Sequence, residues 1–162
     1  MPHQAEDIWL NTPEKQQNGL ESILLSDWPV SNAKWANEKI EKEFTKILKL
    51  REIVTKAIEP LRAEKEIGSS LEVAVYVSGG DKELLETYKN ELSNIFITSQ
   101  AYITDSKPEG VMNEYKEDDY TIYVTRAHGE KCDRCWKYRD LIDIDGNGAI
   151  CRECMDAING KD

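Results

Sequence analysis

Hydrophobic residues recur at helical spacing along residues 34–58. Lysine and glutamate fill the positions between them, which predicts a long amphipathic helix. Ser31 or Asn32 can cap this helix. Pro60 lacks an N–H, so we expect the helix to kink or end near it. The apolar positions are Trp35, Ile40, Phe44, Ile47, Leu48, Leu50, Val54 and Ile58.

The pattern changes to alternation after this segment. Residues 71–77 alternate and are rich in β-branched side chains, which indicates a strand. Asp81 can cap a helix that reaches about Leu92, and further strands are expected over 95–103 and 120–125. Strand, helix, strand and strand predict a small α+β unit.

The start of the chain carries two short apolar pieces. Residues 5–10 predict a short helix that contains Trp9, and residues 22–29 predict an extended stretch. Neither piece can bury a tryptophan by itself. This is typical of a chain that begins partway through a domain, and an N-terminal arm packed on the remainder is the alternative.

All four cysteines of the 162-residue chain lie in its last thirty-one residues. Cys132 and Cys135 form one Cys-x-x-Cys pair, and Cys151 and Cys154 form a second. Two such pairs at this spacing supply four sulfurs to one ion, so they predict a zinc ribbon or finger with one Zn²⁺. Because all four ligands come from the protein, the ion is expected to be structural.

Other interpretations of these residues are weaker. Two disulfides would require a secreted chain, and a redox dithiol would not need a second copy. Residues 143–150 match the first positions of a calcium loop, but the twelfth position is Cys154 instead of a bidentate glutamate. We therefore expect residues 145–148 to form the turn of a hairpin between the two pairs.

The composition restricts partners and location. The net charge is −10, which argues against general affinity for nucleic acid. Residues 34–66 are the exception, with nine lysines and arginines against seven acidic residues. No apolar run is long enough to cross a membrane and no signal peptide is evident. Reduced cysteines without an export signal indicate the cytoplasm.

Aromatic and basic residues alternate after the first cysteine pair. Trp136 is interleaved with Arg134, Lys137 and Arg139, a pattern that suits stacking on unpaired bases with contacts to phosphate. The alternative is that Trp136 shields the metal site from water. We do not expect His128 to be a ligand, because four cysteines already fill the coordination of the ion. No catalytic pair of side chains stands out.

Three separated stretches resemble one family. Residues 5–9 with 24–29 are similar to the end of the anticodon-binding helical domain of bacterial isoleucyl-tRNA synthetases, and residues 66–72 are similar to the segment that follows. Residues 129–136, with Cys151 and Cys154, resemble the C-terminal zinc module of these enzymes. The resemblance divides the chain into residues 1–66, the end of the anticodon-binding domain; 67–127, the α+β unit; and 128–162, the zinc module.

The resemblance implies a class I, ATP-dependent ligase whose tail holds isoleucine tRNA on the anticodon side. The His-x-Gly-His and Lys-Met-Ser-Lys-Ser signatures of the family are absent from the chain, so we do not expect it to activate isoleucine alone. Three hypotheses follow: an RNA-binding appendage; a structural zinc tail that docks on the synthetase or another protein; and, third, a free-standing DNA-binding zinc protein.

Overall fold

The computed structural model describes residues 2–13, 19–144 and 148–160. Helices and strands are mixed in these residues, which confirms the α+β class. The chain divides into two compact units, Met1–Glu38 and Lys39–Asp162. The three-part division of the chain made from the sequence stays a prediction.

The first unit is built on helix α1, Pro2–Leu10, where the sequence predicts a short helix. The indole Nε1 of Trp9 donates a hydrogen bond to the carbonyl of Leu20 at 3.2 Å. This bond fixes the helix to the chain that leads into the 3₁₀ turn η1, Ile23–Leu25. A 3₁₀ turn at this position replaces part of the predicted extended stretch, because the Ser22 hydroxyl accepts from the Leu24 N–H and caps the turn.

The long helix, α3, covers Glu38–Ala63 and has 26 residues. It starts later than predicted because Asn32 caps a separate 3₁₀ turn, η2, at Ala33–Trp35. The helix continues past Pro60, which lies in the last turn, and the buried side chain of Leu61 follows it. The apolar face is buried only from Ile47 onward, through Ile47, Leu50, Ile53, Val54, Ala57, Ile58 and Leu61.

A four-stranded sheet forms the centre of the second unit, with the strand order β2-β1-β4-β3. The β1–β2 pair is parallel, and the β1–β4 and β4–β3 pairs are antiparallel. The chain passes from β1 to β2 through two short helices, and the 3₁₀ turn η3, Ser70–Glu72, leads into β1. The bounds are Val73–Gly79 for β1, Lys82–Tyr88 for α4, Leu92–Ile95 for α5, Gln100–Ile103 for β2, Val111–Glu117 for β3 and Tyr120–Arg126 for β4.

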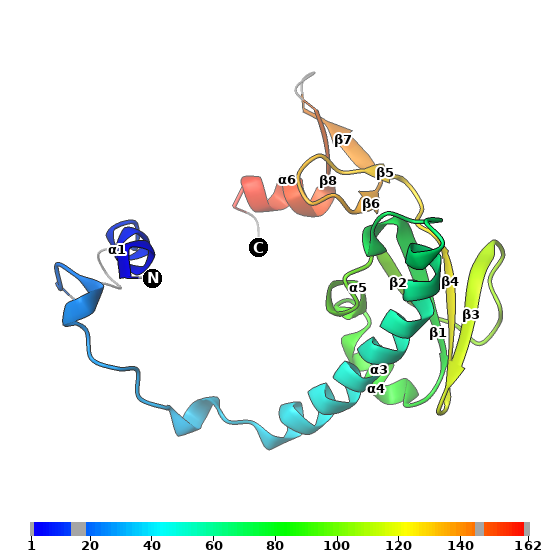
Figure 1. Cartoon of the computed structure of the whole chain (residues 1–162), viewed down its shortest axis with the longest axis horizontal. Helices are drawn as coiled ribbons and strands as arrows, with labels where there is room; N and C mark the ends of the chain where they lie inside the picture. The colour runs from blue at the N-terminus through cyan, green and yellow to red at the C-terminus, as the bar shows by residue number, and fades with distance from the viewer. Residues whose placement is uncertain (1, 14–18, 145–147, 161–162) are drawn as a thin grey trace. The chain divides into compact units, whose positions relative to one another are not determined.

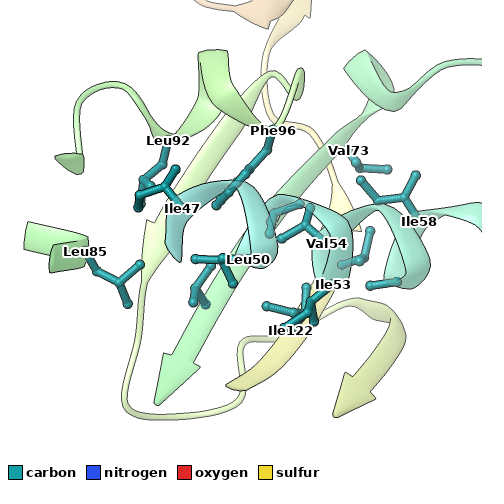
Figure 2. Packing of buried hydrophobic residues seen from close by; sticks show 14 of the residues in the cluster. Ile47, Leu50, Ile53, Val54, Ile58, Val73, Leu85, Leu92, Phe96 and Ile122 are labelled. Carbon is teal, nitrogen blue, oxygen red and sulfur yellow. The ribbon is translucent and has the colours of Figure 1, made fainter. Parts of the chain in front are cut away.

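The hydrophobic core lies between the helices and one face of this sheet. Side chains of α3, such as Leu50 and Val54, pack against strand residues, such as Val73 and Ile122 (Figure 2). The α4–α5 segment closes the core with Leu85, Leu92 and Phe96. The ribbons of α3, α4 and α5 lie on one side of the strands (Figure 1).

Two strand predictions need correction. The predicted strand over 95–103 is extended only from Gln100, because Ile95 ends α5 and Ile97 adopts a left-handed backbone with φ of 57°. The edge strand β3 was missed. Its Asn, Glu and Lys residues conceal the alternation, although Met112 and Tyr115 pack on the core.

The C-terminal residues form two short hairpins and a helix. Strand β5 pairs antiparallel with β6, and β7 pairs antiparallel with β8. The predicted turn between the last two strands falls on residues 145–147, which lie outside the described residues. The bounds are Glu130–Lys131 for β5, Tyr138–Arg139 for β6, Leu141–Asp143 for β7, Ala149–Cys151 for β8 and Arg152–Ile158 for α6.

Candidate metal centre and nucleic-acid interface

The first cysteine pair lies in the turn between β5 and β6. The Cys132 N–H donates to the carbonyl of Lys137 at 2.9 Å, and the Trp136 N–H donates to the carbonyl of Cys132 at 2.9 Å. These two bonds close a tight loop around Cys135. The loop aims both thiols to the same side, as expected of a Cys-x-x-Cys knuckle.

The second pair lies where β8 passes into α6. Cys151 is the last residue of β8 and precedes the first residue of the helix, and Cys154 lies in the first helical turn. The helix places the two thiols on the same side, because Cys151 and Cys154 are three residues apart. The Cys151 N–H also donates to the sulfur of Cys132 at 3.3 Å, which links the two pairs.

The four sulfurs form one cluster in which all lie within 4.8 Å of one another. The Sγ atoms of Cys132 and Cys154 are 3.9 Å apart, and those of Cys135 and Cys151 are 3.7 Å apart. All four cysteines are free thiols. A tetrahedral ion with metal–sulfur bonds of about 2.3 Å would separate its ligands by about 3.8 Å, so the cluster has the dimensions of a four-sulfur metal site.

The thiols differ strongly in their tendency to ionise. Burial opposes ionisation of Cys132, but backbone N–H groups of Cys135, Cys151 and Arg134 outweigh it and lower the pKa to about 6. Burial raises the pKa of Cys135 to about 12, and it raises the pKa of Cys151 as well. Four thiolates this close together would repel one another, so full ionisation of this cluster requires a cation among the sulfurs.

The surroundings of the cluster fit a closed metal site. Three of the four cysteines are buried, and Ile150 with Leu141, Ile144 and Met155 packs against them. The carboxylate of Asp133 accepts a hydrogen bond from the Ala149 N–H at 2.9 Å, which ties the first knuckle to the second hairpin. The four cysteines could therefore bind a metal ion with no position left for water or substrate.

The side chain of Trp136, for which the sequence left base stacking and shielding of the metal site as alternatives, is exposed in the structure. Trp136 has 61% of its surface exposed, so its ring does not lie over the sulfurs as a buried cover. The ammonium of Lys131 lies 5.5 Å from the centre of the indole ring, a cation–π distance. Trp136 also has a left-handed backbone with φ of 64°, which is unusual for a bulky residue.

The other three predicted tRNA contacts have internal partners. The pKa of Arg134 is raised by hydrogen bonding to the sulfur of Cys154 and by the negative charge that this sulfur carries when ionised. Lys137 contacts the side-chain oxygen of Asn94. Arg139 lies 3.4 Å from the carboxylate of Glu153, and its buried Nε has no hydrogen-bond partner among the residues that the structure describes.

Sequence analysis missed the residue that joins the cysteine region to the sheet. The Nε2 amide of Gln100, in β2, donates to the carbonyls of His128 at 2.9 Å and Tyr138 at 2.7 Å. Its Oε1 accepts from the His128 N–H at 3.1 Å. The hydroxyl of Ser99 adds a further link, because it accepts a hydrogen bond from the Tyr138 N–H at 2.7 Å. No local pattern marks Gln100, because its partners lie 28 and 38 residues away.

Comparisons with known proteins find similarity to tRNA ligases. Residues 1–77 match the family described as the anticodon-binding domain of tRNA ligase. The isoleucine–tRNA ligase of Thermoanaerobacter sp. (strain X514) is 36% identical over 95% of this chain and 17% of its own length. That of Macrococcus caseolyticus is 34% identical over 99% of this chain, and the chloroplastic/mitochondrial enzyme of Arabidopsis thaliana is 35% identical over 98%. The chain thus spans about one sixth of these relatives. Among its described residues, no helix is both long and apolar enough to cross a membrane.

Proposed function

We propose that this chain, which matches the C-terminal part of isoleucine–tRNA ligases, is the zinc- and tRNA-binding portion of such a ligase and holds isoleucine tRNA on its anticodon side. Cys132, Cys135, Cys151 and Cys154 would hold one Zn²⁺. Thiolates favour this ion, and the spacing of the sulfurs suits its tetrahedral geometry. When bound, the ion would cross-link the two hairpins and α6 through these four cysteines.

Trp136 is the observation that carries the tRNA proposal. A non-glycine residue in a left-handed conformation costs about 1–3 kcal/mol, and glycine would avoid this cost. The protein keeps a large aromatic ring there, 61% exposed, with Lys131 against it. An exposed ring flanked by a cation suits stacking on an unpaired base and contact with the adjacent phosphate.

The proposal is tested by titrating labelled isoleucine tRNA with the zinc-loaded chain in fluorescence anisotropy. We expect binding that weakens steeply as salt rises, because phosphate contacts release counterions. The Trp136→Ala substitution should weaken binding about fivefold to 150-fold, since stacking on one base is worth about 1–3 kcal/mol. Its zinc content should stay that of the wild-type chain.

The matched control is Ile97→Ala. Ile97 also has a left-handed backbone, with φ of 57°, and is 49% exposed, but it lies outside the cysteine module and outside residues 1–77. It should leave tRNA affinity unchanged. Equal loss in both variants, or competition by duplex DNA as effective as that by tRNA, would contradict the assignment. Loss of zinc from Trp136→Ala would instead indicate a shielding role for the ring.

A second function, docking on the remainder of a synthetase or on another protein, is favoured by apolar side chains near the start of the chain. Large hydrophobic residues are exposed in the first unit and, separately, at the beginning of α3, and exposed apolar surface of this extent favours a protein interface. A Trp28→Ser/Val30→Ser variant should lose association with the remaining portion of a related ligase, whereas Trp136→Ala should retain it. The exposed residues are Ile8, Leu10, Leu24, Leu25, Trp28, Val30, Trp35, Ile40, Phe44 and Leu48.

A further inference from the structure

Three tyrosines form a row across the face of the sheet that the core does not use. Tyr76 of β1 is paired in register with Tyr102 of β2 on one side and with Tyr123 of β4 on the other. The neighbours of each tyrosine along its own strand point into the core or pack against it. Because side chains alternate along a strand, the three rings stand together on the opposite face of the sheet from α3.

The rings are accessible and close enough to act as one platform. Tyr102 has 42% of its surface exposed, and Tyr76 and Tyr123 are half-buried. The ring centres of Tyr76 and Tyr102 lie 4.9 Å apart, with an angle of 34° between the ring planes. Neighbouring strands are about 4.8 Å apart, so the row offers two or three adjacent aromatic surfaces.

Positive charge lies at the β3 end of the row. The ammonium of Lys107 lies 5.9 Å from the ring centre of Tyr123. Lys107 and Lys116 approach the same carboxylate, that of Glu114, at 2.7 and 3.0 Å. Glu114 is paired with Tyr123 in the ladder, so this end of the row carries two cations against one anion.

The β2 end of the row carries cations in ion pairs. A pocket beside Tyr102 has Lys89, Arg139 and Glu153 as its charged lining residues. Lys89 lies 3.1 Å from the carboxylate of Glu86, and Arg139 lies 3.4 Å from that of Glu153, so this end is balanced in charge. Aromatic rings with a net-positive end at β3 match a strand of nucleic acid, whose bases stack and whose phosphates need cations.

We propose that the Tyr102–Tyr76–Tyr123 row is a second RNA contact, on which unpaired bases of the bound tRNA stack. The proposal rests on the tRNA-binding function argued above and adds a surface outside the cysteine module. A four-stranded sheet that presents aromatic rings in register can stack two or three unpaired bases. The surface is also continuous with the module, because Arg139 lines the pocket at the β2 end.

Leucine substitutions remove the rings but keep apolar bulk on the sheet. The test compares the double variant Tyr102→Leu/Tyr123→Leu with Tyr102→Phe/Tyr123→Phe, both in the full zinc-loaded chain. Two probes are titrated: isoleucine tRNA and an unstructured RNA octamer of mixed sequence. We expect the leucine variant to bind both probes at least fivefold more weakly, and the phenylalanine variant to bind within about twofold of wild type. Circular dichroism should be the same for all three chains.

Each failure has its own signature. If the leucine variant binds both RNAs like wild type while Trp136→Ala still weakens tRNA binding, the tyrosine row is refuted and the proposed function stands. If the phenylalanine variant loses as much affinity as the leucine variant, the hydroxyl groups act instead of the rings and stacking is refuted. A wild-type chain that binds neither RNA refutes both proposals.

Discussion

Zinc removal should unfold the cysteine module and leave the sheet folded. Within the module's cluster, Ile150 is the one fully buried side chain that is not a cysteine among the described residues. Burial of one such side chain stabilises by about 1.5–3 kcal/mol. Ligation of structural zinc by four thiolates is worth about 10–16 kcal/mol near neutral pH. The metal is therefore expected to be the dominant source of the module's stability.

Hydrogen exchange read by mass spectrometry resolves the two parts of the second unit. After chelation, amides in 130–158 should lose protection, while those of the core strands β1 and β4 should keep most of theirs. Adding zinc back should restore the first set. Elemental analysis must confirm that the metal is gone. Unchanged protection of the module in a verified zinc-free sample would refute the claim that ligation holds it together.

Three further predictions can be checked with single substitutions. Trp136→Gly should relieve the left-handed strain, so the module's unfolding midpoint should hold or rise while tRNA affinity falls, as measured by urea titration and anisotropy. Gln100→Leu leaves buried backbone groups of the module unpaired, at about 1–3 kcal/mol for each such group, and should lower the unfolding free energy in urea. The Lys46 ammonium lowers the pKa of Asp81, and the Leu84 N–H adds to this effect. The stabilisation from Asp81 is therefore present at neutral pH and is lost as the pH falls through the lowered folded-state pKa. Asp81→Asn should flatten this acid-side loss in a pH series of thermal melts.

The elements that could be predicted from the sequence are those with a strong local signal. Helix α3 and strands β1 and β4 have clear periodicity, and Asp81 caps α4 as expected, with its carboxylate accepting from the Leu84 N–H at 3.2 Å. Strand β3 has no such signal, because a bulge between Val111 and Asn113 interrupts the alternation and Asn113, which donates to the Ala57 carbonyl of α3, places a polar residue against the helix. The helix was predicted to begin at residue 34, because the apolar residues of η2 and early α3 have helical spacing. These residues are exposed, and spacing alone does not reveal whether a partner covers an apolar face.

The candidate site was predicted in part for the same reason. Cysteine spacing is a local signal, and the four sulfurs do gather into one cluster. The basic residues near them were interpreted as RNA contacts from sequence proximity alone. In the structure, Arg134 interacts with the sulfur of Cys154 and Lys137 contacts Asn94. Both contacts depend on tertiary packing. The tyrosine row depends on strand register, which no single segment of the sequence specifies.

Gln100 determines how the two proposed RNA surfaces are placed relative to each other. Its buried amide uses both donor and acceptor on the module backbone, while Tyr102 lies two residues further along the same strand and on the same face. A buried amide that holds three backbone groups permits little rotation of the module on the sheet. The module that carries Trp136 is therefore held in a fixed orientation on the sheet that carries the tyrosine row. One RNA can contact both only if its unpaired bases match that fixed arrangement, which makes shape a source of selectivity beyond charge.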